Sequence, residues 1–366
     1  MKSTRSVRIF TGISIATLAI SAVCALAFGT VSASITKIDA FAGIDKRPER
    51  VSSAINYLLV GSDTREGLSK AELKALRVGS VATAAGKRSD TMLLVHISKA
   101  RDKAVLVSIP RDSYALIPEH LNKSGKKIPA SYSKINSAFN WGGAPLLIQT
   151  LEEMTQLKID HYIEVNFAGF ARVVDSLGGI EVCTKKDIDD PKSHLVLPAG
   201  VHTLNGIEAL KYVRTREFDG LGDIGRMQRQ QAFMSSVLKK ATSAGVLLNP
   251  VTMTNFINSS LSAVTTDEGL KNSDLITLAK QMKSLATSNV RTLTVPLSNL
   301  NYYANGVTAS VLWDPILAPE LWDRLREDRA VIDEVIPSPS PSATEAAKVE
   351  IIDKFKTRTA ADNICR

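Results

Sequence analysis

Cysteine and histidine are scarce in this sequence, which limits the metal sites that it can build. The chain of 366 residues has three cysteines, five histidines and no Cys-x-x-Cys pair. Zinc sites held by thiolates need several such ligands at short spacing. The composition therefore argues against metal binding by thiols.

Acidic residues are absent from the chain before Asp39. Lys2, Arg5 and Arg8 instead precede an uncharged run from Ile9 to Ile35. A bilayer is spanned by about 20 apolar residues, and the basic flank of such a segment stays in the cytoplasm. We therefore expect a cytoplasmic N-terminus at residues 1–8, a transmembrane anchor at 9–35, and the remaining chain outside the cell.

A cleaved signal peptide is the alternative for this N-terminal run. Val31-Ser32-Ala33 resembles a cleavage site. However, the run exceeds the roughly 7–15 apolar residues of a signal-peptide core, which favours an uncleaved anchor. No second apolar run of spanning length follows. The sequence therefore predicts a single-pass membrane protein with an extracellular domain.

The anchor contains Cys24, which leaves Cys183 and Cys365 in the exported part. An oxidising compartment permits a disulfide, and two cysteines suffice for one. The alternative is that both stay reduced, with Cys183 buried in a strand and Cys365 on a frayed tail. Sequence alone does not supply the geometry that would decide between them.

The excess of basic residues favours acidic partners. The formal net charge is +8 and the isoelectric point is near 9.3, which suits phosphates, polyanions or an anionic membrane surface. An exported location argues against nucleic acid.

Alternating strand and helix patterns predict an α/β domain whose sheet is covered by helices on both faces. A polar linker at 36–53 precedes this domain, which we place at 54–330. The run from Pro337 to Ser342 marks a Pro/Ser-rich linker at 331–347, and a charged tail occupies 348–366.

Three consecutive predicted strands begin or end at aspartate and arginine. The strand at 56–61 leads to Asp63 and Arg65, Arg88 and Asp90 precede the strand at 91–97, and Arg111 follows the strand at 104–109. Routine salt bridges at strand ends are one explanation. The other is a ligand site, because open α/β sheets bind ligands at the ends of their strands.

Asp63 and Asp90 would repel each other unless a cation or a proton lay between them. Mg²⁺ is the natural candidate, since it binds one or two carboxylates together with substrate phosphates. A shared proton or simple pairing with arginine remains the alternative.

Two predicted helices place further basic groups near one another. Arg214 and Arg216 close a helix that Asn205 would cap, while Arg226 and Gln230 stand four residues apart near the start of the next. Guanidinium groups bind phosphate bidentately, and several together suit a pyrophosphate. Lys134 is either a surface lysine or one more positive group at this site. The apolar stripe of the second helix is expected in the core; its members are Met227, Met234, Leu238 and Ala241.

These motifs, in this order, resemble the LytR-CpsA-Psr family of bacterial cell-wall enzymes. The resemblance covers about residues 50–245 and extends more weakly to Trp313-Asp314 and Asp328. It is carried by the segments 56–65, 88–92, 108–112, 134–136, 173–179 and 212–231. Each motif is weak alone, whereas their order behind an N-terminal anchor is specific.

The resemblance implies a phosphotransferase with a central mixed β-sheet sandwiched between helices and a long apolar pocket for a lipid tail. Such an enzyme moves a glycopolymer phosphate from a polyprenyl pyrophosphate carrier to the muramic acid 6-hydroxyl of peptidoglycan, releasing polyprenyl phosphate. The positions that match the family's pyrophosphate site are Arg88, Arg111, Lys134, Arg214, Arg216, Arg226 and Gln230. Those that match its Mg²⁺ site are Asp63 and Asp90, and with Arg111 these two would be catalytic.

Two other functions fit the same residues. The first is a non-catalytic protein that binds exported polyanions or lipid pyrophosphates, or that regulates as an attenuator; paired aspartates near the ligand argue against it. The second is a hydrolase that transfers the phosphate to water, which differs from a ligase only in the acceptor.

Overall fold

The computed structural model describes residues 35–65, 68–76, 89–122, 124–217, 219–220, 222–247, 249–271, 273–274, 287–335 and 350–359. The predicted anchor at 9–35 therefore lies outside the described residues, apart from its last residue. None of the described helices has the length and apolar character needed to cross a membrane. The apolar pattern from Leu275 to Leu285 predicts a further helix, and this segment also lies outside the described residues.

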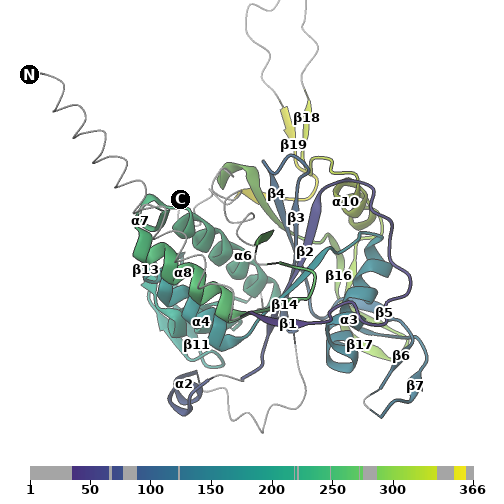
Figure 1. Cartoon of the computed structure of the whole chain (residues 1–366), viewed down its shortest axis with the longest axis horizontal. Helices are drawn as coiled ribbons and strands as arrows, with labels where there is room; N and C mark the ends of the chain where they lie inside the picture. The colour runs from purple at the N-terminus through teal and green to yellow at the C-terminus, as the bar shows by residue number, and fades with distance from the viewer. Residues whose placement is uncertain are drawn as a thin grey trace, which may run out of the picture.

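The fold is built on one mixed sheet of eight strands (Figure 1). Across the sheet the strands are β1 (Thr36–Ile38), β14 (Val264–Asp267), β9 (His161–Val165), β2 (Ile55–Ser62), β3 (Ser89–Ile97), β4 (Ala104–Ile109), β15 (Val290–Thr294) and β20 (Arg358–Thr359). β2 runs parallel to β9, β4 runs parallel to β15, and β3 is antiparallel to both of its neighbours. The predicted strands in these regions are confirmed, and the sheet is mixed as the resemblance implied.

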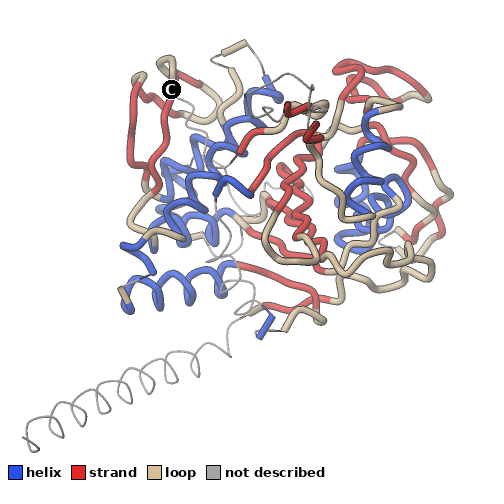
Figure 2. Tube along the Cα trace, turned by 90° about the horizontal axis from the view of Figure 1, so that it is seen from above, coloured by secondary structure: helices blue, strands red, loops and turns tan. Residues whose placement is uncertain are grey.

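Helices cover both faces of the sheet (Figures 1 and 2). One face packs on α3 (Ile135–Thr155) and α10 (Leu317–Arg326), whose apolar residues share one core with the strands. The other side carries α4 (Phe167–Ser176), α5 (Gly206–Arg214), α6 (Gly222–Ala241) and α8 (Pro250–Ala263). A second apolar cluster joins α4, α5 and α6. The shorter helices are α2 (Lys70–Leu76) and α7 (Ala244–Leu247).

Small two-stranded ribbons surround this sandwich. They pair β5 (Tyr114–Ile117) with β8 (Ser131–Lys134), β6 (His120–Leu121) with β7 (Lys127–Ile128), β10 (Ile180–Thr184) with β13 (Gly200–Leu204), β11 (Ile188–Asp190) with β12 (Leu195–Leu197), β16 (Leu297–Ala304) with β17 (Val307–Trp313), and β18 (Asp333–Val335) with β19 (Glu350–Ile352). The sequence from Ile180 to Cys183 predicts a strand; the strand exists, but it lies in one of these ribbons and not in the central sheet.

The glycines at 142–143 and Pro145 predict a helix from about Pro145 to Leu157, and the structure breaks the helix at this point. Gly143, at a φ of 67°, is non-helical and separates the first segment of α3, which begins at Ile135, from the segment that contains Pro145 and ends at Thr155. A positive φ of this kind is tolerated by glycine. The apolar residues and caps from Trp313 to Leu325 predict the segment that closes the domain. This segment contains the end of β17 and α10, and the Asp314 carboxylate accepts bonds from the N–H groups of Ile316 and Leu317.

Part of the predicted C-terminal tail packs against the domain. β20 extends the central sheet beside β15, and Phe355 is buried in the main core. Cys183, in β10, is disulfide-bonded. Its partner lies outside the described residues, so pairing with Cys365 stays a prediction.

Asp190 fixes the turn that follows α5. Its side chain is buried, and one carboxylate oxygen accepts bonds from the N–H groups of Lys192 and Ser193 at 2.8 and 2.9 Å. The other accepts from the N–H groups of Arg216 and Glu217. Burial acts to raise the pKa of Asp190, but these four donors outweigh it and hold the pKa below its ordinary value. One carboxylate therefore sets the backbone that carries Arg216.

We expect Asp190→Asn to lower the free energy of unfolding by about 2–4 kcal/mol, because the amide nitrogen would face two N–H donors that lose their acceptor. The lowered pKa means that this carboxylate stabilises the fold above a pH of about 4 and that its contribution is lost as the pH falls through the folded-state pKa. Denaturant titrations between neutral and acidic pH measure both effects. Equal acid sensitivity of the wild type and the Asp190→Asn variant would contradict the assignment.

Gly206 allows α5 to approach α4 closely. A Cβ atom at this position would lie 2.3 Å from the carbonyl oxygen of Ala171 in α4. The N–H of Gly206 also donates to the Asp175 carboxylate at 2.7 Å. The first turn of α5 is closed by a capping box between Asn205 and Glu208, which confirms Asn205 as the predicted cap.

We expect Gly206→Ala to destabilise the protein by about 1–3 kcal/mol, as overpacking against backbone does. Gly245→Ala in α7 is the matched control, since its Cβ would meet only one side-chain atom, at 3.9 Å. Thermal unfolding of both variants tests the contact. A Gly206→Ala melting temperature equal to that of the control would show that α4 and α5 do not pack this closely.

Candidate functional site

The site lies at the carboxyl ends of the parallel strands. β2, β4, β9 and β15 point the same way, so the residues that follow them meet at one edge of the sheet. Asp63 and Arg65 follow β2, Arg111 follows β4 and Asn166 follows β9. Ligands of open α/β sheets bind at this edge. The structure thus brings the predicted strand-end residues to one place.

A β-bulge sits at Asp90, beside Asp63. Gly61 pairs with Thr91 and Ser62 pairs with Ser89, so Asp90 is the extra residue of β3. Bulges of this kind are common next to active sites. The backbones that carry Asp63 and Asp90 are therefore neighbours. The side chain of Asp90 and all of Arg88 lie outside what the structure describes, so their predicted roles stay predictions.

Arg111 and Lys134 share one carboxylate. Asp112 lies 3.6 Å from Arg111 Nε and 3.4 Å from Lys134 Nζ. The Arg111 carbonyl also accepts a bond from the N–H of Asn136 at 3.1 Å, which ties the start of α3 to the end of β4. The Lys134 side chain is 30% exposed. Lys134 is therefore a partly buried ion-paired group beside Arg111, and not a free surface lysine.

Arg214 lies over the carboxyl end of β9. It is the last residue of α5, and its guanidinium stands 5.1 Å from the ring centre of Phe167, the first residue of α4. Such a cation–π contact holds the charged group beside the ring. Arg216 follows two residues later on the turn held by Asp190.

α6 joins these elements. Gln230 Nε2 donates to the Val213 carbonyl at 3.1 Å, and Arg229 donates to the Thr215 carbonyl at 2.6 Å and to the Asp219 carboxylate. Arg226 is 2% exposed. Gln230, which the resemblance placed at the pyrophosphate, thus has one amide N–H bonded to α5, and its role toward phosphate stays a prediction.

Gln231 is a site residue that the sequence pattern did not indicate. Its buried amide nitrogen donates to Ser108 Oγ at 2.9 Å and to Thr294 Oγ1 at 3.0 Å. These hydroxyls lie at the carboxyl ends of β4 and β15. Gln231 therefore positions the N-terminal half of α6 over the sheet edge. Its place beside Gln230 was visible in the sequence, but its partners are distant in the chain.

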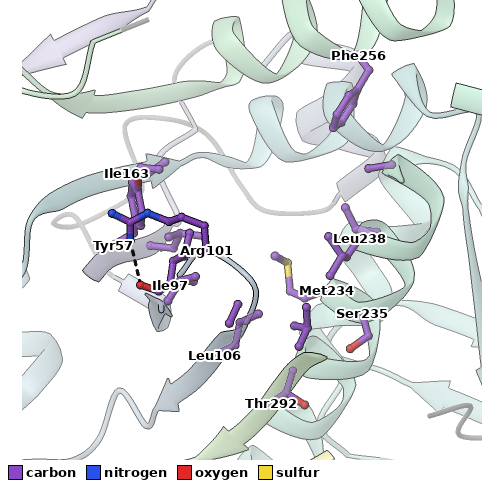
Figure 3. Close-up of a pocket in the computed structure, with 16 residues that line it drawn as sticks. Tyr57, Ile97, Arg101, Leu106, Ile163, Met234, Ser235, Leu238, Phe256 and Thr292 are labelled. Carbon is purple, nitrogen blue, oxygen red and sulfur yellow. Dashed lines mark hydrogen bonds between the residues drawn. The ribbon is translucent and has the colours of Figure 1, made fainter. Parts of the chain in front are cut away.

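A cavity of about 240 Å³ lies between the sheet and α6 (Figure 3). Its lining is almost entirely apolar, and side chains of five strands face α6 and α8 across it. These residues are Tyr57, Leu59, Val95, Ile97, Arg101, Ala104, Leu106, Ile163, Met234, Ser235, Val237, Leu238, Ala241, Phe256, Val290 and Thr292. We call this space the apolar pocket.

The apolar pocket and the charged edge lie along the same face of the sheet and the same stripe of α6. Side chains alternate along a strand, so Leu59 in the pocket and Asp63 at the edge belong to one face of β2 and its extension. On α6, Arg226, Gln230, Met234 and Leu238 recur every four residues and form one stripe. Met227 is buried, as predicted. Leu238 and Ala241 are partly buried and pack on core clusters, and together with Met234 they also line the pocket.

The far end of the pocket contains Arg101 and Tyr57. Arg101 donates to the Ile97 carbonyl at 3.3 Å (Figure 3) and also to the carbonyls of Ser53 and Ser98 at 3.1 and 3.0 Å, so its charge is directed at backbone oxygens. Burial raises the pKa of Tyr57 to about 12, which keeps the phenol neutral. Neither residue was recognised from the sequence.

Metal-ligating side chains do not cluster in the described parts of the chain. Histidine, cysteine, aspartate and glutamate form no group of three or more there that could hold a metal ion. A Mg²⁺ site of two carboxylates and substrate oxygens needs fewer protein ligands. The adjacent backbones of Asp63 and Asp90 at the bulge fit such a site.

Sequence relatives are cell-wall proteins. The chain is 38% identical over 275 residues to the probable cell wall biosynthesis protein LcpB of Corynebacterium glutamicum, covering 75% of this chain and 62% of LcpB. It is 31% identical over 269 residues to LcpA of the same organism, covering 68% of this chain and 51% of LcpA. The chain thus spans about half to three fifths of these relatives. The polyisoprenyl-teichoic acid–peptidoglycan teichoic acid transferase TagT of Bacillus subtilis is 36% identical over 196 residues, covering 52% of this chain and 53% of TagT.

Solved structures share the fold. TagT with bound octaprenyl pyrophosphate lipid is 27% identical, with a TM-score of 0.54, covering 81% of this chain and 98% of that one. A LytR-Csp2A-Psr enzyme from Actinomyces oris, at 22% identity, has a TM-score of 0.61 and covers 80% of this chain and 96% of that one. The LytR_cpsA_psr family model matches residues 29–318. The chain belongs to the LytR_cpsA_psr family.

Proposed function

We propose that this protein is a phosphotransferase that moves a cell-wall glycopolymer phosphate from a polyprenyl pyrophosphate carrier to the muramic acid 6-hydroxyl of peptidoglycan. The observation that carries the proposal is the α6 stripe, which runs from Arg226 to Leu238 over one sheet face. A ligand that fits both ends has a diphosphate head and an apolar tail. A relative of known structure, TagT, holds octaprenyl pyrophosphate.

Binding and catalysis use the same charges. Arg111, Arg214, Arg216 and Arg226, with Lys134 and Gln230, would hold the diphosphate, and Arg88 would join them. Phosphoryl transfer needs alignment and stabilisation of negative charge on the equatorial and leaving oxygens. The Arg214 guanidinium, held beside Phe167, and Arg216, whose backbone is fixed by the Asp190 turn, supply this with little reorganisation.

The reaction balances without a redox partner. The acceptor hydroxyl oxygen forms a bond to the phosphorus that carries the glycan, and the bridging P–O bond breaks. Polyprenyl phosphate leaves with the bond electrons. The acceptor proton passes to a base, for which Asp63 and Asp90 are the available carboxylates.

Asp63 and Asp90 would also hold Mg²⁺. The ion would neutralise charge on the phosphate oxygens when bound. The support for this cofactor is the pair of neighbouring backbones at the β3 bulge.

The proposed location is the outer surface of the cell membrane. The uncharged run at 9–35 behind Lys2, Arg5 and Arg8 supports a single-pass anchor with a cytoplasmic N-terminus. A tether there suits a substrate whose tail leaves the bilayer only when an apolar cavity replaces it.

Mass spectrometry of the reaction products tests the function. The full-length chain in detergent is given a short-chain polyprenyl pyrophosphate glycan, Mg²⁺ and peptidoglycan fragments. We expect phosphate-linked glycan on the acceptor, with the rate reduced about 100-fold or more in Arg111→Ala, since removing one oriented donor of transition-state charge costs that much. Asp63→Ala should also lose product.

The controls separate the alternatives. Arg358 lies in β20, the outermost strand of the sheet, and outside the site. Arg358→Ala should therefore keep full activity. Free phosphoglycan with released lipid phosphate would favour a hydrolase. Tight lipid binding with no turnover on any acceptor would favour a non-catalytic binding protein.

A further inference from the structure

A second groove lies beyond the phosphate site, next to α3. It has a volume of about 500 Å³, and its lining includes His120, Asn122, Ser124, Ser131, Asn140 and Trp141. We call it the His120–Trp141 groove. The reaction described above makes no use of it.

An aromatic pair forms one part of this groove. The rings of His120 and Trp141 stack at 5.5 Å between centres and 12° between planes. His120 Nδ1 donates to the Pro118 carbonyl at 2.9 Å, which fixes the ring. Trp141 stays 37% exposed although its ring is apolar. It ends the first segment of α3, where Gly143 bends the helix away.

Amides and hydroxyls form the rest of the groove. Asn122 Oδ1 accepts bonds from Ser124 and Lys126 within the turn, which fixes its orientation and directs its NH₂ group elsewhere. The described lining residues include no lysine, arginine, aspartate or glutamate, and Asn140 adds a second amide to them. An exposed aromatic ring beside neutral hydrogen-bonding groups suits an uncharged polyhydroxyl ligand.

The groove is within reach of the phosphate site. Ser131 and Lys134 are the two ends of β8, about 10 Å apart along an extended strand. Asn140 lies one turn beyond Asn136, about 6 Å along the helix axis, and the N–H of Asn136 is bonded to Arg111. A short oligosaccharide attached at the phosphate site, or presenting a hydroxyl to it, spans such a distance.

We propose that the His120–Trp141 groove is a carbohydrate-binding subsite that holds a glycan strand while its phosphate chemistry takes place at Arg111. This proposal rests on the proposed function for the identity of the glycan. Two sources share the chemistry: the peptidoglycan acceptor and the glycopolymer on the lipid donor.

Calorimetry of the full-length chain in detergent tests the subsite without turnover. The probe is a β-1,4-linked N-acetylglucosamine tetramer. We expect Trp141→Ala and Asn140→Ala to weaken binding about tenfold or more, as truncation of a central aromatic contact does. Trp141→Phe should retain most of the affinity. Tyr303→Ala, which removes an exposed aromatic ring on β16, is the matched control and should bind like the wild type.

Kinetics then distinguish the two sources. A rise in KM for peptidoglycan fragments in Trp141→Ala, with kcat retained, assigns the groove to the acceptor. A rise in KM for the lipid-linked donor assigns it to the donor glycan. If Trp141→Ala and Asn140→Ala change neither tetramer binding nor either KM while both variants remain folded, the subsite does not exist. If the protein shows no ligase activity but these variants still lose tetramer binding, the subsite is supported and the proposed function is rejected.

Discussion

The contact between Gln231 and the ends of β4 and β15 is the constraint on which the site depends. One buried amide bonds to two hydroxyls on neighbouring parallel strands. It fixes the N-terminal half of α6 over the sheet edge, while side chains of the C-terminal half face the sheet across the cavity. An unpaired buried amide costs about 1–3 kcal/mol, so α6 has little freedom to shift along the sheet. The charged edge and the apolar pocket are consequences of this one placement.

The charged side chains at the edge are held in place by contacts with other parts of the fold as well as by one another. The Asp190 carboxylate sets the Arg216 turn, Phe167 supports Arg214, and Asp112 pairs with both Arg111 and Lys134. Positive groups at close range repel, so each needs such a partner in the absence of ligand. A diphosphate would then bind to groups already in place, which reduces the entropic cost of binding. The same preorganised groups stabilise the negative charge that develops in the transition state.

The sequence predicted the parts of this site that lie along the chain. Strands that end at Asp63 and Arg111, and a helix that ends at Arg214, follow from local patterns, and the structure brings these ends together. The resemblance implied an apolar pocket, but its walls could not be predicted. The four-residue spacing of Met234 and Leu238 fits a packed core and a cavity wall equally well. Gln230 and Gln231 were equally difficult, since which neighbour an amide bonds depends on tertiary packing. The His120–Trp141 groove needs a bend at Gly143 whose side-chain consequences no local pattern gives.

We expect one ligand to occupy the charged edge and the apolar pocket together. The affinity of the full-length protein is measured for polyprenyl pyrophosphates of increasing chain length, in the wild type and in Ala241→Phe. This substitution narrows the apolar pocket, because Ala241 lines it. Val251→Phe, at an exposed position of α8, is the control. In the wild type and in the control, affinity should rise with chain length, by at most about 0.8 kcal/mol of binding free energy for each buried CH₂. In Ala241→Phe, affinity should stop rising at a shorter chain length. Equal dependence on chain length in all three proteins would contradict this expectation.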